Sequence, residues 1–265
     1  MRKLMEYKII SGRTVEIKRT WMPKEPGQKK QRGIRRAGAS SEKKIRANEK
    51  DTVRRLARII NCNFREGDVF ASLTYDADHY PEGFTYEQAK NQMKKCLRKL
   101  RDQYRKKTGR KLKAIWVTAN WSPKKQSPAR IHQHIIIPDD ATEMLRKLWQ
   151  EFGGIGTFKM ETMDARGDHS DLAGYMLENV HDRPANENKW SCCRGMDKPV
   201  FTEPVEVYDI EDVQPIKGSV VKDVVESRDE EGRVSGKYIR CVLRERPKIC
   251  GGQIVMPKKG RSKCL

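Results

Sequence analysis

The sequence lacks several features that would assign it to a common class of protein. No run of apolar residues approaches the about 18 that a transmembrane helix needs, and no signal-peptide core follows Met1. The seven cysteines are odd in number and show no C-x-x-C spacing, which disfavours both a disulfide framework and a structural zinc site. We therefore expect a soluble, intracellular protein that does not bind a membrane and whose thiols are reduced.

Acidic residues are too few to balance the basic ones. Lys and Arg total 56 against 36 Asp and Glu, which gives a formal net charge of +20 and a pI near 9.7. Such an excess is expected of a protein that meets a polyanion. With 36% apolar residues in 265, the chain can still build a substantial core, so one generous domain or a domain with appendages fits.

The basic residues concentrate in two segments. Residues 24–36 hold six cations and one acid together with Pro and Gly, which favours a flexible arm. Residues 90–113 hold twelve cations and one acid. Here Ala89, Met93, Leu97, Leu100 and Tyr104 keep helical spacing, and Thr85 with Gln88 resembles a capping box. We expect a helix whose exposed faces are basic, with nucleic-acid phosphates as the balancing charge.

The order of the predicted elements indicates an α+β fold. The elements are a hairpin over 7–20 that turns at Ser11-Gly12-Arg13, a helix over 41–62, a strand over 68–75, the basic helix, strands over 113–119 and around 131–137, a helix over 142–152, a strand over 155–162 and a helix over 170–180. This order predicts an antiparallel-rich, five-stranded sheet with helices on its faces.

Histidine is scarce, yet two of the five histidines lie one residue apart in A-R-I-H-Q-H-I-I-I. This segment is typical of a buried strand. Because strand side chains alternate faces, His132 and His134 leave the sheet on the same side, close enough to share one ion. On spacing alone, a pair of hydrogen-bonded or half-exposed histidines is the commoner outcome, and both interpretations stay open.

A set of motifs resembles a known superfamily. F-A-S-L-T-Y-D, a basic helix, W-V-T-A-N, R-I-H-Q-H-I-I-I, D-L-A-G-Y-M-L-E-N and W-S-C-C-R-G-M-D-K-P-V are similar, in order and spacing, to the HUH endonucleases that initiate rolling-circle replication. The closest likeness is to the replication-associated proteins of small phages and mobile elements, over residues of about 65 to 205.

The resemblance implies a metal-dependent enzyme that nicks one strand of DNA. His132 and His134 would hold Mg²⁺ or Mn²⁺ against the scissile phosphate, and Tyr175 would be the nucleophile, leaving a 5′-phosphotyrosine and a free 3′-OH. Gly174 and Ala173 beside it leave room for a substrate backbone. On helix spacing alone, Tyr175 is instead a packing residue.

The resemblance also leaves the third metal ligand open. The usual ligand position before the histidines holds Ala119 and Asn120, so Asp76 or Glu178 is the expected ligand. Glu178 also replaces the lysine of the usual Y-x-x-K motif, and it would repel phosphate unless it binds metal or pairs with Arg183 or Lys189. Gln133 stands where a hydrophobic residue is common, but it points away from both imidazoles.

The expected partner is single-stranded DNA or an origin hairpin in the cytoplasm of a bacterial host cell, with host replication proteins as further partners. The DNA would lie across the sheet with its phosphates on the basic helix. The residues assigned to DNA binding are Lys94, Lys95, Arg98, Arg101, Arg105, Arg130 and Trp121, with Trp116 as a second candidate for base stacking. The alternatives are a nonenzymatic DNA-binding protein with a degenerate site, and a transposase or relaxase of the same superfamily.

The last part of the chain reverses the charge balance. Residues 203–231 carry ten acids and three bases and include strand-like alternation. We therefore predict three segments: an N-terminal hairpin with a basic arm (1–40), a nicking domain (41–200), and an acidic, β-rich extension that ends in a basic tail (201–265).

Overall fold

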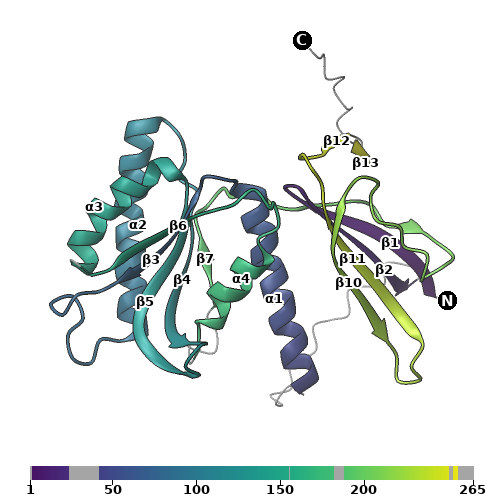
Figure 1. Cartoon of the computed structure of the whole chain (residues 1–265), viewed down its shortest axis with the longest axis horizontal. Helices are drawn as coiled ribbons and strands as arrows, with labels where there is room; N and C mark the ends of the chain where they lie inside the picture. The colour runs from purple at the N-terminus through teal and green to yellow at the C-terminus, as the bar shows by residue number, and fades with distance from the viewer. Residues whose placement is uncertain (1, 24–41, 155, 182–187, 251–252, 256–265) are drawn as a thin grey trace, which may run out of the picture. The chain divides into compact units, whose positions relative to one another are not determined.

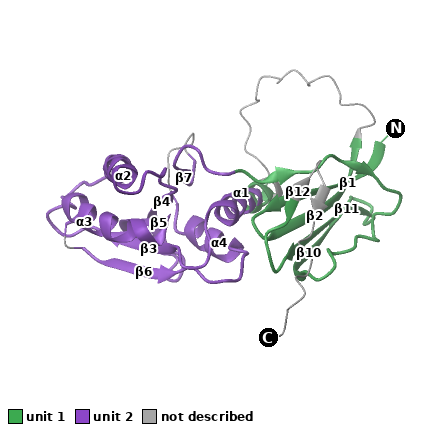
Figure 2. Ribbon diagram, turned by 90° about the horizontal axis from the view of Figure 1, so that it is seen from above, with its two compact units in different colours: residues 1–50, 198–265 green, residues 51–197 purple. Residues whose placement is uncertain are grey.

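The computed structural model describes residues 2–23, 42–154, 156–181, 188–250 and 253–255. The predicted basic arm, Arg183 and the basic tail lie outside these residues. The chain forms two compact units, one of residues 1–50 and 198–265 and the other of residues 51–197 (Figure 2). Within the described ranges, no helix combines the length and the apolar character needed to span a bilayer.

Residues 51–197 contain the predicted five-stranded sheet, in the order β6-β3-β5-β4-β7. Its strands are β6 (Phe158–Thr162), β3 (Val69–Thr74), β5 (Ser127–Ile137), β4 (Ile115–Ser122) and β7 (Ser191–Cys192). Every neighbouring pair is antiparallel, and β4 and β5 form the expected hairpin. The predicted α+β fold with an antiparallel, five-stranded sheet is therefore confirmed.

Helices cover both faces of this sheet (Figure 1). One face packs against α2 (Tyr86–Thr108) and α3 (Thr142–Gly153), which follows the short helix η1 (Asp139–Ala141). The other face packs against α4 (Ser170–Glu178) and the part of α1 (Glu42–Asn63) that belongs to this unit. The strand residues alternate between the two cores, as the period of two requires.

The basic helix forms where its sequence predicts. The Thr85 hydroxyl accepts the Gln88 backbone N–H, and the Gln88 side chain accepts the Thr85 N–H, which is a complete capping box. The helix ends at Gly109, which adopts a φ of 70° that favours glycine. The buried residues keep one stripe: Ala89, Met93, Cys96, Leu97, Leu100 and Tyr104.

The other unit joins the two ends of the chain in one sheet. Its order is β10-β11-β2-β1-β8, and β9 also pairs with β1. The strands are β1 (Arg2–Ser11), β2 (Thr14–Pro23), β8 (Val200–Phe201), β9 (Val205–Glu206), β10 (Val220–Arg228) and β11 (Val234–Val242), with a separate hairpin of β12 (Lys248–Cys250) and β13 (Gln253–Val255). The predicted turn at Gly12-Arg13 closes β1 onto β2.

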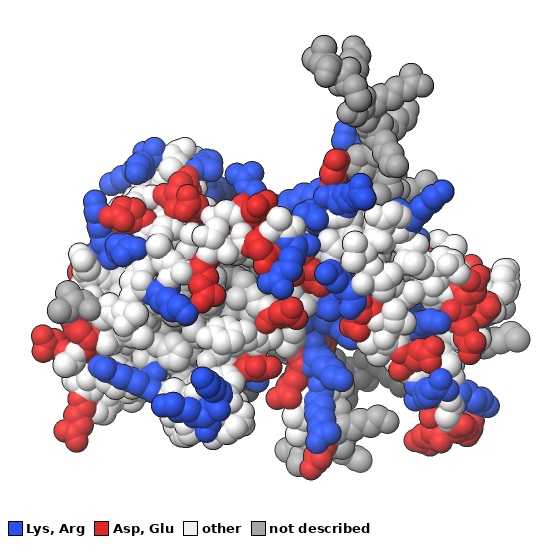
Figure 3. Space-filling view, in the orientation of Figure 1, with Lys and Arg blue, Asp and Glu red and all other residues white. Residues whose placement is uncertain are grey.

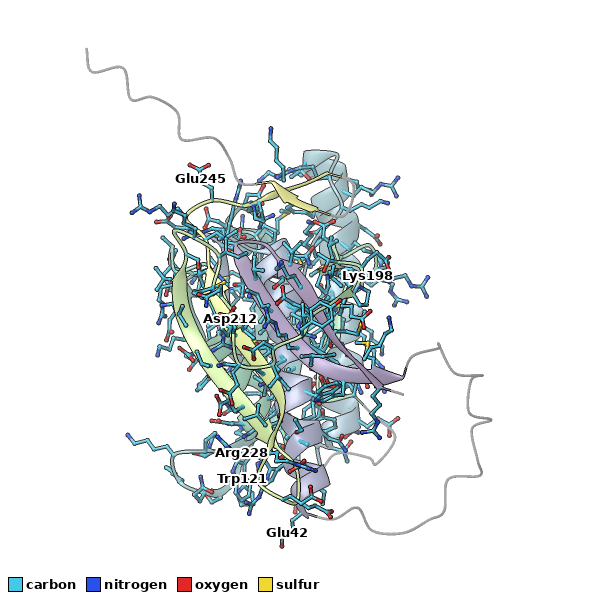
Figure 4. All side chains as sticks on the ribbon, turned by 90° about the vertical axis from the view of Figure 1, so that its right-hand side faces the viewer. Glu42, Trp121, Lys198, Asp212, Arg228 and Glu245 are labelled. Atoms are coloured by element: carbon cyan, nitrogen blue, oxygen red, sulfur yellow. The ribbon has the colours of Figure 1, made fainter. Side chains whose placement is uncertain are left out.

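The sequence analysis places the N-terminal hairpin and residues 201–265 in separate segments, whereas β2 pairs directly with β11 from Thr14↔Val242 to Thr20↔Gly236. The three-segment division itself stays a prediction. Exposed side chains such as Asp212, Arg228 and Glu245 project from this unit (Figure 4).

Candidate functional site

The register of β5 decides which face carries the histidines. His134 lies opposite Ser72 of β3 and Val117 of β4, and His132 lies opposite Thr74. The His134 ring stacks on Phe70 with the ring centroids 5.4 Å apart. Phe70 and Val117 belong to the core beneath α1 and α4, so both histidines face that side of the sheet.

The two imidazoles converge through the same ring nitrogen. His132 Nε2 and His134 Nε2 are 3.1 Å apart. The other nitrogen of each ring is already held, since His132 Nδ1 lies 2.9 Å from the Arg130 carbonyl and His134 Nδ1 lies 2.9 Å from the Ser72 hydroxyl. A carbonyl only accepts, so His132 donates from Nδ1 and presents a lone pair at Nε2.

Burial keeps both rings neutral. It lowers the pKa of His134 to about 3, helped by the neighbouring His132 and opposed by a hydrogen bond with the Asn179 side chain. It also lowers the pKa of His132, against a hydrogen bond to the Arg130 backbone. Neutral imidazole is the form that binds a metal ion, so the pair is ready to coordinate at neutral pH.

The candidate nucleophile lies beside this pair. Tyr175 comes from α4, and its ring centroid is 5.4 Å from that of His134 and 6.0 Å from that of Phe70, which it meets edge-on. The side chain is 47% exposed, so a DNA strand can reach it. Of its two small neighbours, Ala173 is fully buried in the core, whereas a methyl group added at Gly174 would meet nothing within 4 Å. Only Gly174 leaves the open space that the sequence analysis assigned to both.

Three residues near the pair carry no motif that the sequence analysis used. Ser72 orients His134, and Asn179 is buried and interacts with both His134 and the Tyr175 carbonyl. Lys159 lies opposite Ser72 across β3–β6, which places it in the same row as His134. The period-two pattern of β3 gives a sequence signal for Ser72, but Lys159 and Asn179 depend on strand pairing and helix docking.

Lys159 brings a positive charge to the tyrosine. Its ammonium lies 3.0 Å from the Glu161 carboxylate. The Glu161 hydrogen bond and charge raise the pKa of Lys159, and the Tyr175 phenol adds to that rise, so the ammonium and the phenol are neighbours. The chain therefore has a cation near Tyr175 although Glu178 replaces the lysine of the usual motif.

The structure does not bring the two predicted carboxylate ligands to the histidines. Among the described residues, no group of three or more His, Cys, Asp or Glu side chains could hold a metal ion. The Asp76 carboxylate instead lies 2.7 Å from His79 Nδ1 and accepts the His79 backbone N–H. Glu178 lies on the exposed side of α4. Asn120 pairs with the backbone of His181 through both amide atoms, which ties the end of α4 to β4.

The histidine pair nevertheless fits a divalent cation. Two ligands at about 2.1 Å from an octahedral ion, at right angles to each other, are about 3.0 Å apart. The observed separation of 3.1 Å between the Nε2 atoms is close to this value. The remaining ligands would be oxygen atoms, for which the Asn179 amide, water and a DNA phosphate are available.

The predicted DNA-binding residues divide between the faces of the sheet. Those on the basic helix, Lys94, Lys95, Arg98, Arg101 and Arg105, come from α2, which packs on the face opposite the histidines. Arg130 lies closer to the site, where its guanidinium donates to the Asp76 carbonyl and stacks on Tyr80.

The two tryptophans proposed for base stacking are partly or wholly occupied. Trp121, labelled in Figure 4, stacks on His181 with the rings 4.3 Å apart and nearly parallel, so one of its faces is covered. Trp116 is buried against α2.

Comparison with known proteins identifies one family. Residues 68–182 match the model of the family described as replication-associated protein, ORF2 or gene 2 protein. This segment runs from β3 past the end of α4 and so includes His132, His134 and Tyr175. No curated protein and no solved structure matches the chain. The matched part of the chain is therefore similar to replication-associated proteins of the rolling-circle type, as its motifs predict.

Proposed function

We propose that this protein nicks one strand of DNA to initiate rolling-circle replication, and that it does so as an HUH-type enzyme with Tyr175 as nucleophile. The observation that carries the proposal is the convergence of His132 Nε2, His134 Nε2 and the Tyr175 ring on one face of one sheet. The family match supports a replication role for the segment that contains all three residues.

Each side chain has a defined part in this reaction. The Arg130 carbonyl and the Ser72 hydroxyl hold the imidazoles so that both Nε2 atoms point to one place. A Mg²⁺ or Mn²⁺ ion bound there would draw negative charge from the phosphate as the attack proceeds. Since imidazole suits Mn²⁺ better than Mg²⁺, we expect Mn²⁺ to be the more effective ion.

Tyr175 performs the covalent step. Its phenol loses a proton, the phenolic oxygen forms a bond to phosphorus, and the bond from phosphorus to the 3′-oxygen breaks. The leaving oxygen takes up a proton and becomes a 3′-OH that can prime synthesis, while the 5′-phosphate remains on the tyrosine. The Lys159 ammonium favours both the phenolate and the anionic phosphate.

The test uses random-sequence single-stranded oligonucleotides labelled at the 3′ end, because the covalent product carries the 3′ fragment. With Mn²⁺, the protein should form a labelled adduct that survives denaturation. Tyr175→Phe and the double variant His132→Ala/His134→Ala should abolish it, whereas Tyr208→Phe, which changes a 95% exposed tyrosine, should not. An adduct that persists in Tyr175→Phe would overturn the assignment of the nucleophile.

A nonenzymatic DNA-binding protein is the second candidate. It is favoured by the absence of a carboxylate ligand near the histidines in the described part of the chain, and by Glu178 at the position of the expected lysine. Salt-sensitive DNA binding without an adduct in either metal would establish this alternative. A transposase or relaxase would share the adduct, and only the DNA sequence joined to the protein distinguishes it.

A further inference from the structure

The cations of α2 differ in whether the protein itself neutralises them. Lys99 pairs with Glu151 of α3, and Arg110, just beyond the helix, pairs with Asp140 of η1. On the other flank of the helix, Lys94, Arg98 and Arg101 line a groove of about 480 Å³. The opposite wall of that groove is the segment from Ser191 to Arg194, which includes the edge strand β7.

No carboxylate balances the charge of this groove. Its lining has four cations, Lys94, Arg98, Arg101 and Arg194, and no acidic residue among those described. The one acidic contact to these cations in the described part of the chain joins Arg101 to its neighbour Asp102 at 3.9 Å, with both side chains at least half exposed. Like charges one helical turn apart repel one another, so the arrangement favours a bound anion.

The shape of the groove fits an extended polyanion. Positions 94, 98 and 101 recur at helical spacing, so their side chains follow the length of the groove about one turn apart. Arg194 faces them from the other wall, and the Ser191 hydroxyl adds a neutral donor. Cations on both walls and an apolar floor at Leu97 and Trp116 suit a sugar–phosphate chain, whose phosphates can reach both rows of cations.

We propose that this groove, between α2 and residues 191–194, is a second DNA-binding site that holds the backbone of a strand away from the phosphodiester being cut. Because α2 and Tyr175 lie on opposite faces of the sheet, one phosphate cannot occupy both sites. The groove therefore determines affinity, and the histidine–tyrosine site determines chemistry. The inference rests on the proposed function only for the identity of the polyanion as DNA.

The experiment compares two triple variants of the full chain that remove the same charge. The groove variant is Arg98→Gln/Arg101→Gln/Arg194→Gln, and the control variant is Lys106→Gln/Lys107→Gln/Lys111→Gln, whose residues are exposed and do not line the groove. Fluorescence anisotropy measures the affinity of each for labelled single-stranded and duplex DNA over a range of NaCl concentrations.

We expect the groove variant to lose about tenfold in affinity at about 0.1 M NaCl, together with about two units of the slope of log K against log salt. The control should lose about threefold or less. Equal losses in the two variants, or an equal affinity of the groove for polyglutamate and for DNA, would overturn the assignment. Circular dichroism checks that both variants are folded.

Adduct formation separates this inference from the proposed function. At saturating DNA, the groove variant should form the Tyr175 adduct at the wild-type rate. If wild type forms no adduct while the groove variant still binds DNA more weakly than the control, the nicking proposal fails and the groove assignment holds. If the groove variant binds normally but no longer reacts, the groove assignment fails.

Discussion

Gln133, between the two histidines, offers a test of how the two faces of the sheet divide the work. Its side chain is fully buried on the α2 side. It accepts a hydrogen bond from Thr118 Oγ1 at 2.9 Å and donates to the Tyr75 hydroxyl at 2.9 Å and to the Ala89 carbonyl at 3.3 Å. This network stabilises the contact of β4 and β5 with α2 but does not reach the imidazoles.

The magnitude follows from which groups Gln133→Leu leaves without a partner. The Tyr75 hydroxyl keeps its bond to the Ala89 carbonyl at 3.4 Å, whereas the buried Thr118 hydroxyl loses its acceptor. One stranded polar group costs about 1–3 kcal/mol, so we expect the free energy of unfolding to fall by about 2 kcal/mol. Thr118→Val should cost a similar amount, since it strands the Gln133 amide oxygen.

The double variant Thr118→Val/Gln133→Leu supplies the sharper result. Replacing both buried partners by apolar groups of similar shape is nearly neutral, so the double variant should lie within about 1 kcal/mol of wild type. Urea unfolding followed by tryptophan fluorescence measures all four proteins. Simple addition of the two single losses would refute the network.

The same variants test the assignment of faces. Because Gln133 and the His132 and His134 imidazoles point to opposite sides of the sheet, all three variants should bind Mn²⁺ within about twofold of wild type, as measured by electron paramagnetic resonance. His132→Ala should abolish that binding. Loss of Mn²⁺ affinity in folded Gln133→Leu protein would refute the separation of the faces.

Three further predictions concern single residues. Lys159→Gln should slow adduct formation about tenfold and Lys159→Arg should retain most of the rate, whereas Lys147→Gln, at an exposed lysine of α3, should have no effect; equal rates in Lys159→Gln and Lys147→Gln would exclude a role for Lys159. Gly174→Ala should raise the free energy of unfolding by up to about 1 kcal/mol, because the new methyl group meets nothing, yet slow adduct formation if the DNA backbone passes there; a more stable and equally active variant would rule out that path. Burial raises the pKa of Cys193 from 9.0 to about 11, so at pH 8 its alkylation, followed by peptide mass spectrometry, should be about 100-fold slower than that of an ordinary thiol and accelerate about tenfold per pH unit. The unfolded thiol ionises first, so the contribution of Cys193 to stability is complete below pH 9 and is lost as the pH rises towards 11.

The charge pattern of the whole surface illustrates why composition alone did not locate the DNA site. Acidic and basic side chains are interspersed over much of the face in Figure 3, and a column of cations follows α1. The net charge of +20 indicates a polyanionic partner, but it does not separate the cations of α2 that carboxylates neutralise from those that line the groove. That distinction depends on which elements pack beside the helix.

Local sequence determined the elements and part of the site. Helical spacing and the Thr85–Gln88 capping box predict α2, and strand alternation places His132 and His134 on one face of β5 whatever the sheet packs against. These features depend on residues a few positions apart, so no long-range contact is needed to specify them. The motif order likewise predicted the replication-associated family.

Only the tertiary structure decided which helix covers which face. The prediction that DNA phosphates on α2 and the histidines share one surface rests on an assumption about faces, and the chain path places α2 on one side and α4 with Tyr175 on the other. Strand register brought Lys159 into the row of His134, and the pairing of β2 with β11 joined the two ends of the chain. The physical reason is that strand alternation fixes which side chains share a face, while the face that a distant helix covers depends on the path of the whole chain.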